Sequence, residues 1–129
     1  MNKKINTKPH CFLSIVGPGG CGKTHLVSEM LKNQRKIFNP TFDRLLYFYN
    51  HFQADYEKLL LECTQEKIDI EFHQGLKWSA VDKCEAEKMR TLVIIDDLYQ
   101  DACEDKNFLD PVVAGRHRNI HLVTLRHNL

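Results

Sequence analysis

The octapeptide GPGGCGKT, residues 17–24, lies between the apolar run CFLSIV (11–16) and the helical pattern of LVSEML (26–31). It matches G-x-x-x-x-G-K-[ST] at every defined position, and its flanks supply the strand and the helix that this pattern requires. Glycines let the backbone wrap around an anion, toward which the loop N–H groups and the start of the next helix are directed. The stretch therefore predicts a phosphate-binding loop within an α/β fold.

The side chains at the end of this loop predict a site for ATP and Mg²⁺. Lys23 is expected to contact the β and γ phosphates, and the Thr24 hydroxyl is expected to bind Mg²⁺. A glycine-rich turn without a ligand is the alternative, and the complete motif with its flanks disfavours it. The predicted nucleotide-binding residues are Gly17, Pro18, Gly19, Gly20, Cys21, Gly22, Lys23, Thr24 and His25.

A second acidic motif, TLVIIDD (91–97), predicts hydrolysis in addition to binding. Its continuous apolar run is typical of a buried parallel strand, and Asp96 at its end is expected to hold Mg²⁺ through water. Asp97 is expected to orient or deprotonate the attacking water. The alternative for Asp97 is a helix N-cap or a solvated acid, because the segment that follows is acidic throughout.

Short apolar runs alternate with helical patterns along the chain, which predicts a three-layer α/β sandwich with a mainly parallel sheet. We expect one domain over 1–129, with an N-terminal tail at 1–10. Ser79 is expected to cap a polar helix. Strands are expected at 11–16, 44–49, 68–72, 91–96 and 120–125, and further helices from 24, over 52–63 and over 108–113.

Composition limits the classes of protein that remain. The chain has 129 residues, and its 18 Lys and Arg nearly balance its 17 Asp and Glu, so no overall basic field attracts a polyanion. No apolar run approaches the roughly 18 residues of a membrane span or the length of a secretory signal, which predicts a soluble intracellular protein. The five cysteines are scattered, and Cys21 with His25 is too small a set for structural zinc.

The segment GRHRNIHLVTLRHNL (115–129) places basic and polar groups on both sides of the last predicted strand. If this strand lies beside the first, His127 comes near the γ-phosphate, where it could sense the nucleotide and position water. Arg116 and Arg118 could act as an arginine finger in a neighbouring subunit or contact a DNA phosphate. A solvated basic loop explains the two arginines equally well.

Four segments together resemble a known family. They are GPGGCGKT, YNHFQADYEKL (49–59), TLVIIDDLYQDA (91–102) and AGRHRNIHLVTLRHNL (114–129). From about Phe12 to Leu129 the chain resembles the DNA-packaging ATPases of double-stranded DNA viruses and Polinton transposons, which are similar to the poxvirus packaging ATPase and belong to the FtsK-HerA superfamily of P-loop NTPases. The family usually has Gln-Asn-Leu where this chain has His127-Asn128-Leu129, and a histidine where this chain has Arg116.

The resemblance implies a phosphate-binding role for Gly17, Gly22, Lys23 and Thr24, and the Walker B role for Asp96 and Asp97. It implies a Mg²⁺-dependent ATPase that forms a homo-oligomeric ring, expected to be a hexamer, and packages double-stranded DNA into a capsid. Double-stranded DNA and capsid proteins would be its partners, at the viral assembly site or in the virion. It also implies that the last strand inserts between the phosphate-loop strand and the acidic strand. Further strands normally follow, so we expect a domain truncated after this sensor strand.

Two other classes of protein remain open. A small-molecule P-loop kinase would share the loop and the fold, but 115–119 is too short for the arginine-bearing lid that such enzymes need. A non-catalytic nucleotide-binding assembly protein would bind ATP without turnover.

Overall fold

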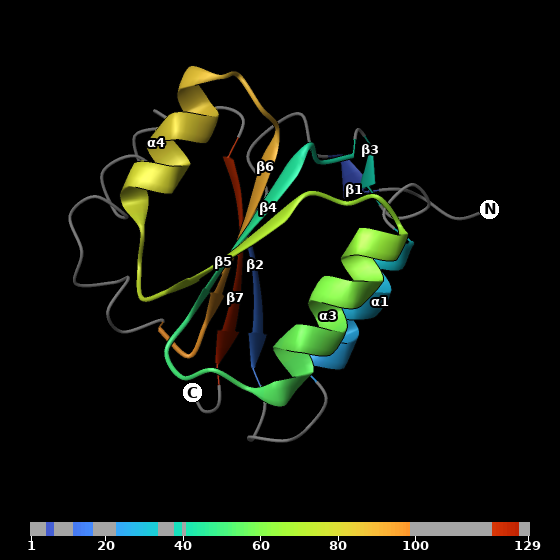
Figure 1. The fold of residues 1–129 in the computed structure, drawn as a ribbon. Coiled ribbons are helices and arrows are strands. Elements are labelled where there is room, and N and C mark those ends of the chain that lie inside the picture. The colour runs from blue at the N-terminus through green and yellow to red at the C-terminus, as the bar shows by residue number, and fades with distance from the viewer. Residues whose placement is uncertain are drawn as a thin grey trace.

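The computed structural model describes residues 5–6, 12–16, 23–33, 38–39, 41–98 and 120–126, and the side chains within 25–33, 41–98 and 120–125. Its centre is a five-stranded sheet in which every pairing is parallel (Figure 1). The prediction of a mainly parallel sheet is confirmed. In spatial order the strands are β2 (Phe12–Val16), β7 (Ile120–Arg126), β6 (Thr91–Asp96), β4 (Arg44–Tyr49) and β5 (Ile70–Gln74).

The strand order is the feature that positions the site. β7 lies between β2 and β6, as the resemblance implied, and β2 forms one edge of the described sheet. The strand before the phosphate-loop sequence and the strand that carries Asp96 are therefore both neighbours of β7. Because all strands run in the same direction, their carboxyl ends meet at one edge.

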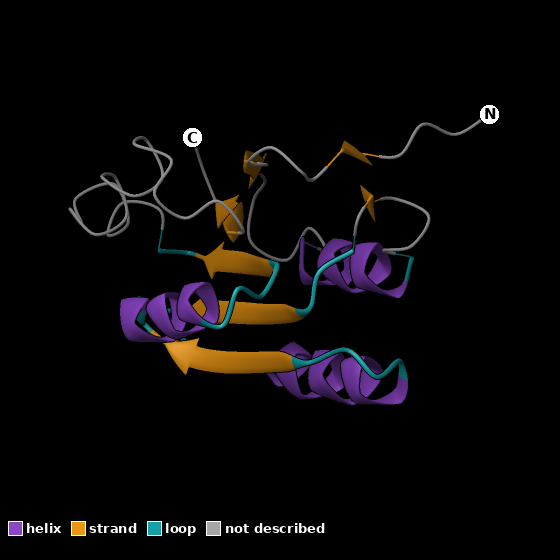
Figure 2. Cartoon of the chain, turned by 90° about the horizontal axis from the view of Figure 1, so that it is seen from above, coloured by secondary structure: helices purple, strands orange, loops and turns teal. Residues whose placement is uncertain are grey.

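Within the described ranges, three helices cover the two faces of the sheet. Helices α1 (Lys23–Lys32) and α3 (Ala54–Gln65) lie on one face, and α4 (Trp78–Ala86) lies on the other (Figure 2). This confirms the predicted three-layer sandwich. A small parallel sheet that was not predicted pairs β1 (Ile5–Asn6) with β3 (Phe38–Asn39), and β1 lies within the expected N-terminal tail.

Successive side chains of each strand point to opposite faces of the sheet. Because helices cover both faces, the sheet is buried from both sides. Every residue of β6 is buried. One core lies beneath α1 and α3 and includes Leu45, Tyr47, Leu92, Ile94, Val123 and Leu125. The other lies beneath α4 and includes Leu46, Phe48, Val93, Ile95 and Leu122.

Some element boundaries differ from the predictions for local reasons. The prediction that Ser79 caps α4 is wrong: the helix already begins at Trp78, with Lys77 at the N-cap and no side-chain hydrogen bond there. Trp78 packs its ring edge-on against Phe48 of the sheet, at a centroid distance of 6.2 Å, which fixes the start of the helix. The predicted strand 68–72 begins later, at Ile70, because the Ile68 N–H closes the end of α3 on Cys63 O at 2.8 Å. The predicted helix 108–113 lies outside the described residues.

We predict that Leu59→Ala lowers the free energy of unfolding by about 2 to 5 kcal/mol, because a buried leucine leaves a cavity when it is truncated. Leu61→Ala is the matched control on the same helix, since Leu59 is 2% exposed and Leu61 is 63% exposed. The control should change stability by no more than about 0.5 kcal/mol. Urea unfolding followed by circular dichroism measures both, and equal losses would contradict the packing of α3 on the sheet.

Candidate nucleotide-binding site

The described strands next to the predicted site end together at the carboxyl edge of the sheet. The register pairs Ile15 of β2 with Leu125 of β7, and Leu125 with Asp96 of β6. Two interstrand spacings therefore separate Asp96 from Ile15, roughly 10 Å across the sheet. β2 ends at Val16, one residue beyond the level of Asp96, and the phosphate-loop sequence follows it in the chain.

The described residues include the last two positions of the loop motif. Lys23 and Thr24 form the first turn of α1, which is where a phosphate loop places them, although only their backbone is described. Residues 17–22 and the predicted residues Arg116, Arg118 and His127 lie outside the described part, so their roles stay predictions. His25 is exposed on α1 and faces the α3 side.

Asp96 is held by two tyrosines that were not predicted to belong to the site. Asp96 is 4% exposed, and its Oδ2 accepts hydrogen bonds from the hydroxyls of Tyr47 and Tyr56, each at 2.7 Å. Tyr47 lies on the neighbouring strand β4, and Tyr56 lies on α3. A buried tyrosine hydroxyl needs a hydrogen-bond partner. A tyrosine at an otherwise apolar core position was therefore the only sequence signal for Tyr47 and Tyr56.

The environment of Tyr56 keeps its hydroxyl protonated. Burial is the main cause that raises the pKa of Tyr56, and the hydrogen bond to Asp96 raises it further. The hydroxyl therefore remains a donor to the carboxylate throughout the ordinary pH range.

An aromatic cluster surrounds the two hydroxyls. We use this name for Tyr47, Tyr49, Phe52, Tyr56 and Phe72. The Tyr56 ring lies 5.0 Å from Tyr47, 5.3 Å from Tyr49 and 5.7 Å from Phe72, measured between ring centroids. Such contacts restrict the rotation of each ring, and the hydroxyls are therefore held in fixed positions.

Asp97 differs from Asp96 although the two are adjacent. Its backbone is left-handed, with φ at 59°, a conformation that aspartate adopts more readily than bulky residues. Its N–H donates to Leu125 O at 3.0 Å and ties the end of β6 to β7. The side chain is exposed, so it is accessible to water at the rim of the site. The alternative role as a helix cap depends on residues after Leu98, which lie outside the described part.

The donor set at this edge fits Mg²⁺. The described residues contain no group of three or more His, Cys, Asp and Glu side chains that could hold a metal by themselves. Magnesium at nucleotide sites does not need such a group, because phosphate oxygens and water complete its shell. Among the described residues, no lysine or arginine forms an ion pair with the buried Asp96 carboxylate. A buried carboxylate in this position is a suitable ligand for a hard cation.

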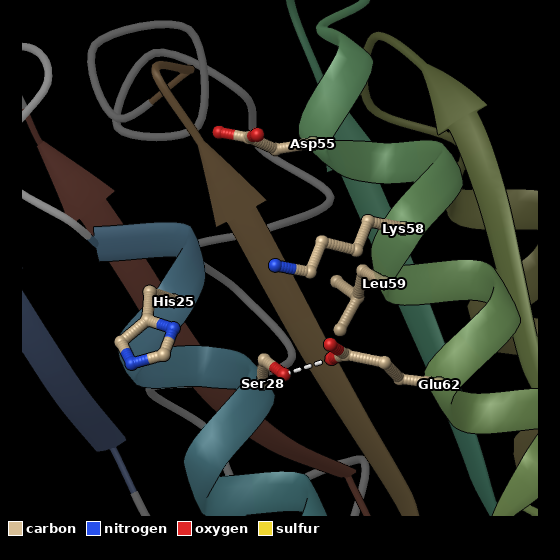
Figure 3. A pocket seen from close by; sticks show the side chains of 6 residues that line it. All are labelled: His25, Ser28, Asp55, Lys58, Leu59 and Glu62. Atoms are coloured by element: carbon tan, nitrogen blue, oxygen red, sulfur yellow. Dashed lines mark hydrogen bonds between the residues drawn. The ribbon is translucent and has the colours of Figure 1, made fainter.

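Helices α1 and α3 are joined beside the site by polar contacts. Ser28 Oγ donates a hydrogen bond to Glu62 Oε2 (Figure 3). Lys32 Nζ lies 3.4 Å from Glu62 Oε1. The bond from Ser28 is the main cause that holds the pKa of Glu62 below its ordinary range, and Lys32 adds to it. A cleft of about 90 Å³ lies between the two helices and is lined by His25, Ser28, Asp55, Lys58, Leu59 and Glu62.

The strand order brings the end of β2, after which the phosphate-loop sequence follows in the chain, and the acid at the end of β6 to one edge of the sheet. This arrangement defines the class as P-loop NTPases. The family follows from a direct match: the model of the NB-ARC domain matches residues 1–128, and the chain belongs to the NB-ARC domain family. It is therefore a nucleotide-binding P-loop module. No curated protein matches the chain significantly.

The family match supports the P-loop NTPase class that the sequence resemblance predicted. It does not extend to the packaging ATPases, so the assignment to that group stays a prediction. Within the described part of the chain, none of the helices has the length and apolar character needed to cross a membrane.

We predict that Ser28→Ala lowers the stability at pH 7, and that this loss shrinks as the pH falls below about 4.3, the ordinary pKa of glutamate. Because the folded-state pKa of Glu62 is depressed, its contribution is fully present above the unfolded-state pKa and is lost as the pH falls through the folded-state value. Urea unfolding between pH 7 and about pH 3 measures the profile.

Ser79→Ala is the control for this experiment, because Ser79 is an exposed serine on α4. Its profile should run parallel to that of the wild type. A loss in Ser28→Ala that stays constant from neutral to acidic pH would show that the charge of Glu62 does not contribute.

Proposed function

We propose that this domain binds ATP with Mg²⁺ at the carboxyl edge of β2, β7 and β6 and hydrolyses it. The observation that carries the proposal is the Asp96 carboxylate, which is buried at the end of the central strand β6 and lies level with Ile15, near the end of the strand that precedes the phosphate-loop sequence. The family match supports nucleotide binding. The proposal of hydrolysis rests on the acidic pair Asp96 and Asp97, at the end of β6 and directly after it.

Each residue has a distinct part in this proposal. Lys23 and the loop N–H groups bind the phosphates, while Thr24 and Asp96 hold the cation. The cation, when bound, neutralises charge that develops on the transferred phosphoryl group. Asp97 orients the attacking water and accepts its proton, for which its exposed position at the rim is suitable.

The remaining predicted residues act on the γ-phosphate in this proposal. His127 follows β7, the strand next to β2, and would sense the nucleotide and position water. Arg116 or Arg118 would complete the site of a neighbouring copy as an arginine finger, which makes hydrolysis depend on assembly. A dilute single chain should then be a poor ATPase.

We predict that Asp97→Asn retains ATP binding but lowers kcat by at least about 100-fold, because the amide cannot accept the proton from water. Asparagine also adopts the left-handed backbone that this position has, so the fold should be unchanged. Phosphate release and calorimetric ATP binding measure the two properties.

Lys23→Ala is the reference variant, since it should lose both binding and hydrolysis by removing the phosphate contact. Unchanged turnover in Asp97→Asn would reject its role with water. If the wild type binds ATP tightly but never hydrolyses it, at any protein or DNA concentration, the domain is instead a non-catalytic nucleotide-binding module.

A more specific proposal is that hydrolysis drives the packaging of double-stranded DNA into a capsid by a ring of these domains. It is supported by the four segments that resemble the packaging ATPases, and the strand order agrees with that resemblance.

We predict that ATP hydrolysis rises with protein concentration and with added double-stranded DNA, because the site is completed between subunits. Phosphate transfer to a nucleoside without a response to DNA would indicate a small-molecule kinase instead.

A further inference from the structure

Asp96 receives its described hydrogen bonds in an unusual arrangement. Two hydroxyls from different elements, Tyr47 on β4 and Tyr56 on α3, converge on the same oxygen, Oδ2, at 2.7 Å each. We propose that these two tyrosines are positioning residues, which clamp Oδ2 so that the other carboxylate oxygen, Oδ1, is directed to the Mg²⁺ that accompanies ATP. This proposal rests on the Mg²⁺-ATP site proposed above.

The chemical nature of the clamp supports this role. A buried carboxylate needs hydrogen-bond partners, and a lysine or arginine would satisfy it while cancelling its charge. Tyrosine hydroxyls are neutral donors, so they fix the carboxylate without an opposite charge that would compete with a cation. Among the described residues, the groups that hold Asp96 are these two hydroxyls.

The geometry of the clamp also explains why two tyrosines are used. A carboxylate at the end of a strand can rotate about its side-chain bonds, and a single hydrogen bond leaves part of that rotation free. Two donors from a strand and a helix define the plane of the carboxylate, and outer groups of this kind commonly tune metal affinity. The rings themselves are fixed, with centroids 5.0 Å apart within the aromatic cluster.

Helix α3 links the clamp to the phosphate-binding side of the site. Tyr56 and Glu62 both lie on α3, and Glu62 binds Ser28 and Lys32 of α1. Helix α1 begins with Lys23 and Thr24. The carboxylate and the predicted phosphate ligands therefore share one support, which keeps their separation constant.

The experiment compares ATP binding by calorimetry in saturating Mg²⁺ and in EDTA. For Tyr47→Phe and Tyr56→Phe we expect unchanged ATP affinity in EDTA. The increase in ATP affinity that Mg²⁺ provides, here called the Mg²⁺-dependent gain, should be about 10-fold smaller than in the wild type. Tyr49→Phe is the matched control, because its ring packs on Tyr56 in the same cluster and it makes no hydrogen bond to Asp96 in the described structure. The control should keep the full Mg²⁺-dependent gain in ATP affinity.

Asp96→Asn provides a second test that does not depend on the folding of the tyrosine variants. Its amide oxygen can still accept both hydroxyls, so the fold should persist while the Mg²⁺-dependent gain is lost. In this background Tyr56→Phe should cause no further loss of the gain.

The outcomes separate the clamp from the site itself. If folded Tyr47→Phe and Tyr56→Phe keep the full Mg²⁺-dependent gain in ATP affinity, the clamp alone is overturned, and the tyrosines are structural partners of a buried acid. A full gain in Asp96→Asn overturns both the clamp and the assignment of Asp96. A wild type without any Mg²⁺-dependent gain overturns the proposed Mg²⁺-ATP site, and the clamp with it.

Discussion

The burial of β6 on both faces is the constraint on which the site depends. All its residues from Thr91 to Asp96 are buried, and its two polar side chains, Thr91 and Asp96, lie at its two ends and have hydrogen-bond partners. Asp96 occupies that end and finds its partners in Tyr47 and Tyr56. The same packing that stabilises the sheet therefore produces a carboxylate with a defined orientation at the carboxyl edge.

The alternation of side chains decides on which face this carboxylate acts. Leu92 and Ile94 pack beneath α1 and α3, whereas Val93 and Ile95 pack beneath α4. Asp96 continues the first series because successive side chains in a strand point to opposite faces. It therefore shares a face with α1, the helix that begins at Lys23, the residue predicted to bind phosphate. A shift of one residue in the register of β6 would move the acid to the wrong side of the sheet.

The sequence allowed accurate prediction of those features that depend on local pattern. The strands 44–49 and 91–96 have the observed bounds, because each is an apolar run with polar neighbours on both sides. The position of β7 beside β2 came from the family resemblance, since no local pattern specifies which strands pair. The partners of Asp96 could not be predicted, because Tyr47 and Tyr56 read as ordinary core positions and lie far from it in sequence. The pairing of β1 with β3 was missed for a similar reason, as each is too short to show alternation.

The adjacent acids Asp96 and Asp97 show how one turn of backbone can separate two chemical roles. A strand that simply continued would place Asp97 on the α4 face of the sheet, opposite to Asp96. The left-handed backbone at Asp97, fixed by its N–H bond to Leu125, ends the strand and leaves the side chain exposed. One carboxylate is thus rigid and buried, which suits its proposed role as a metal ligand, and the other is open to solvent, which suits its proposed role with water. Two acids in different environments can perform two functions in one site, and here a single residue with positive φ creates the difference.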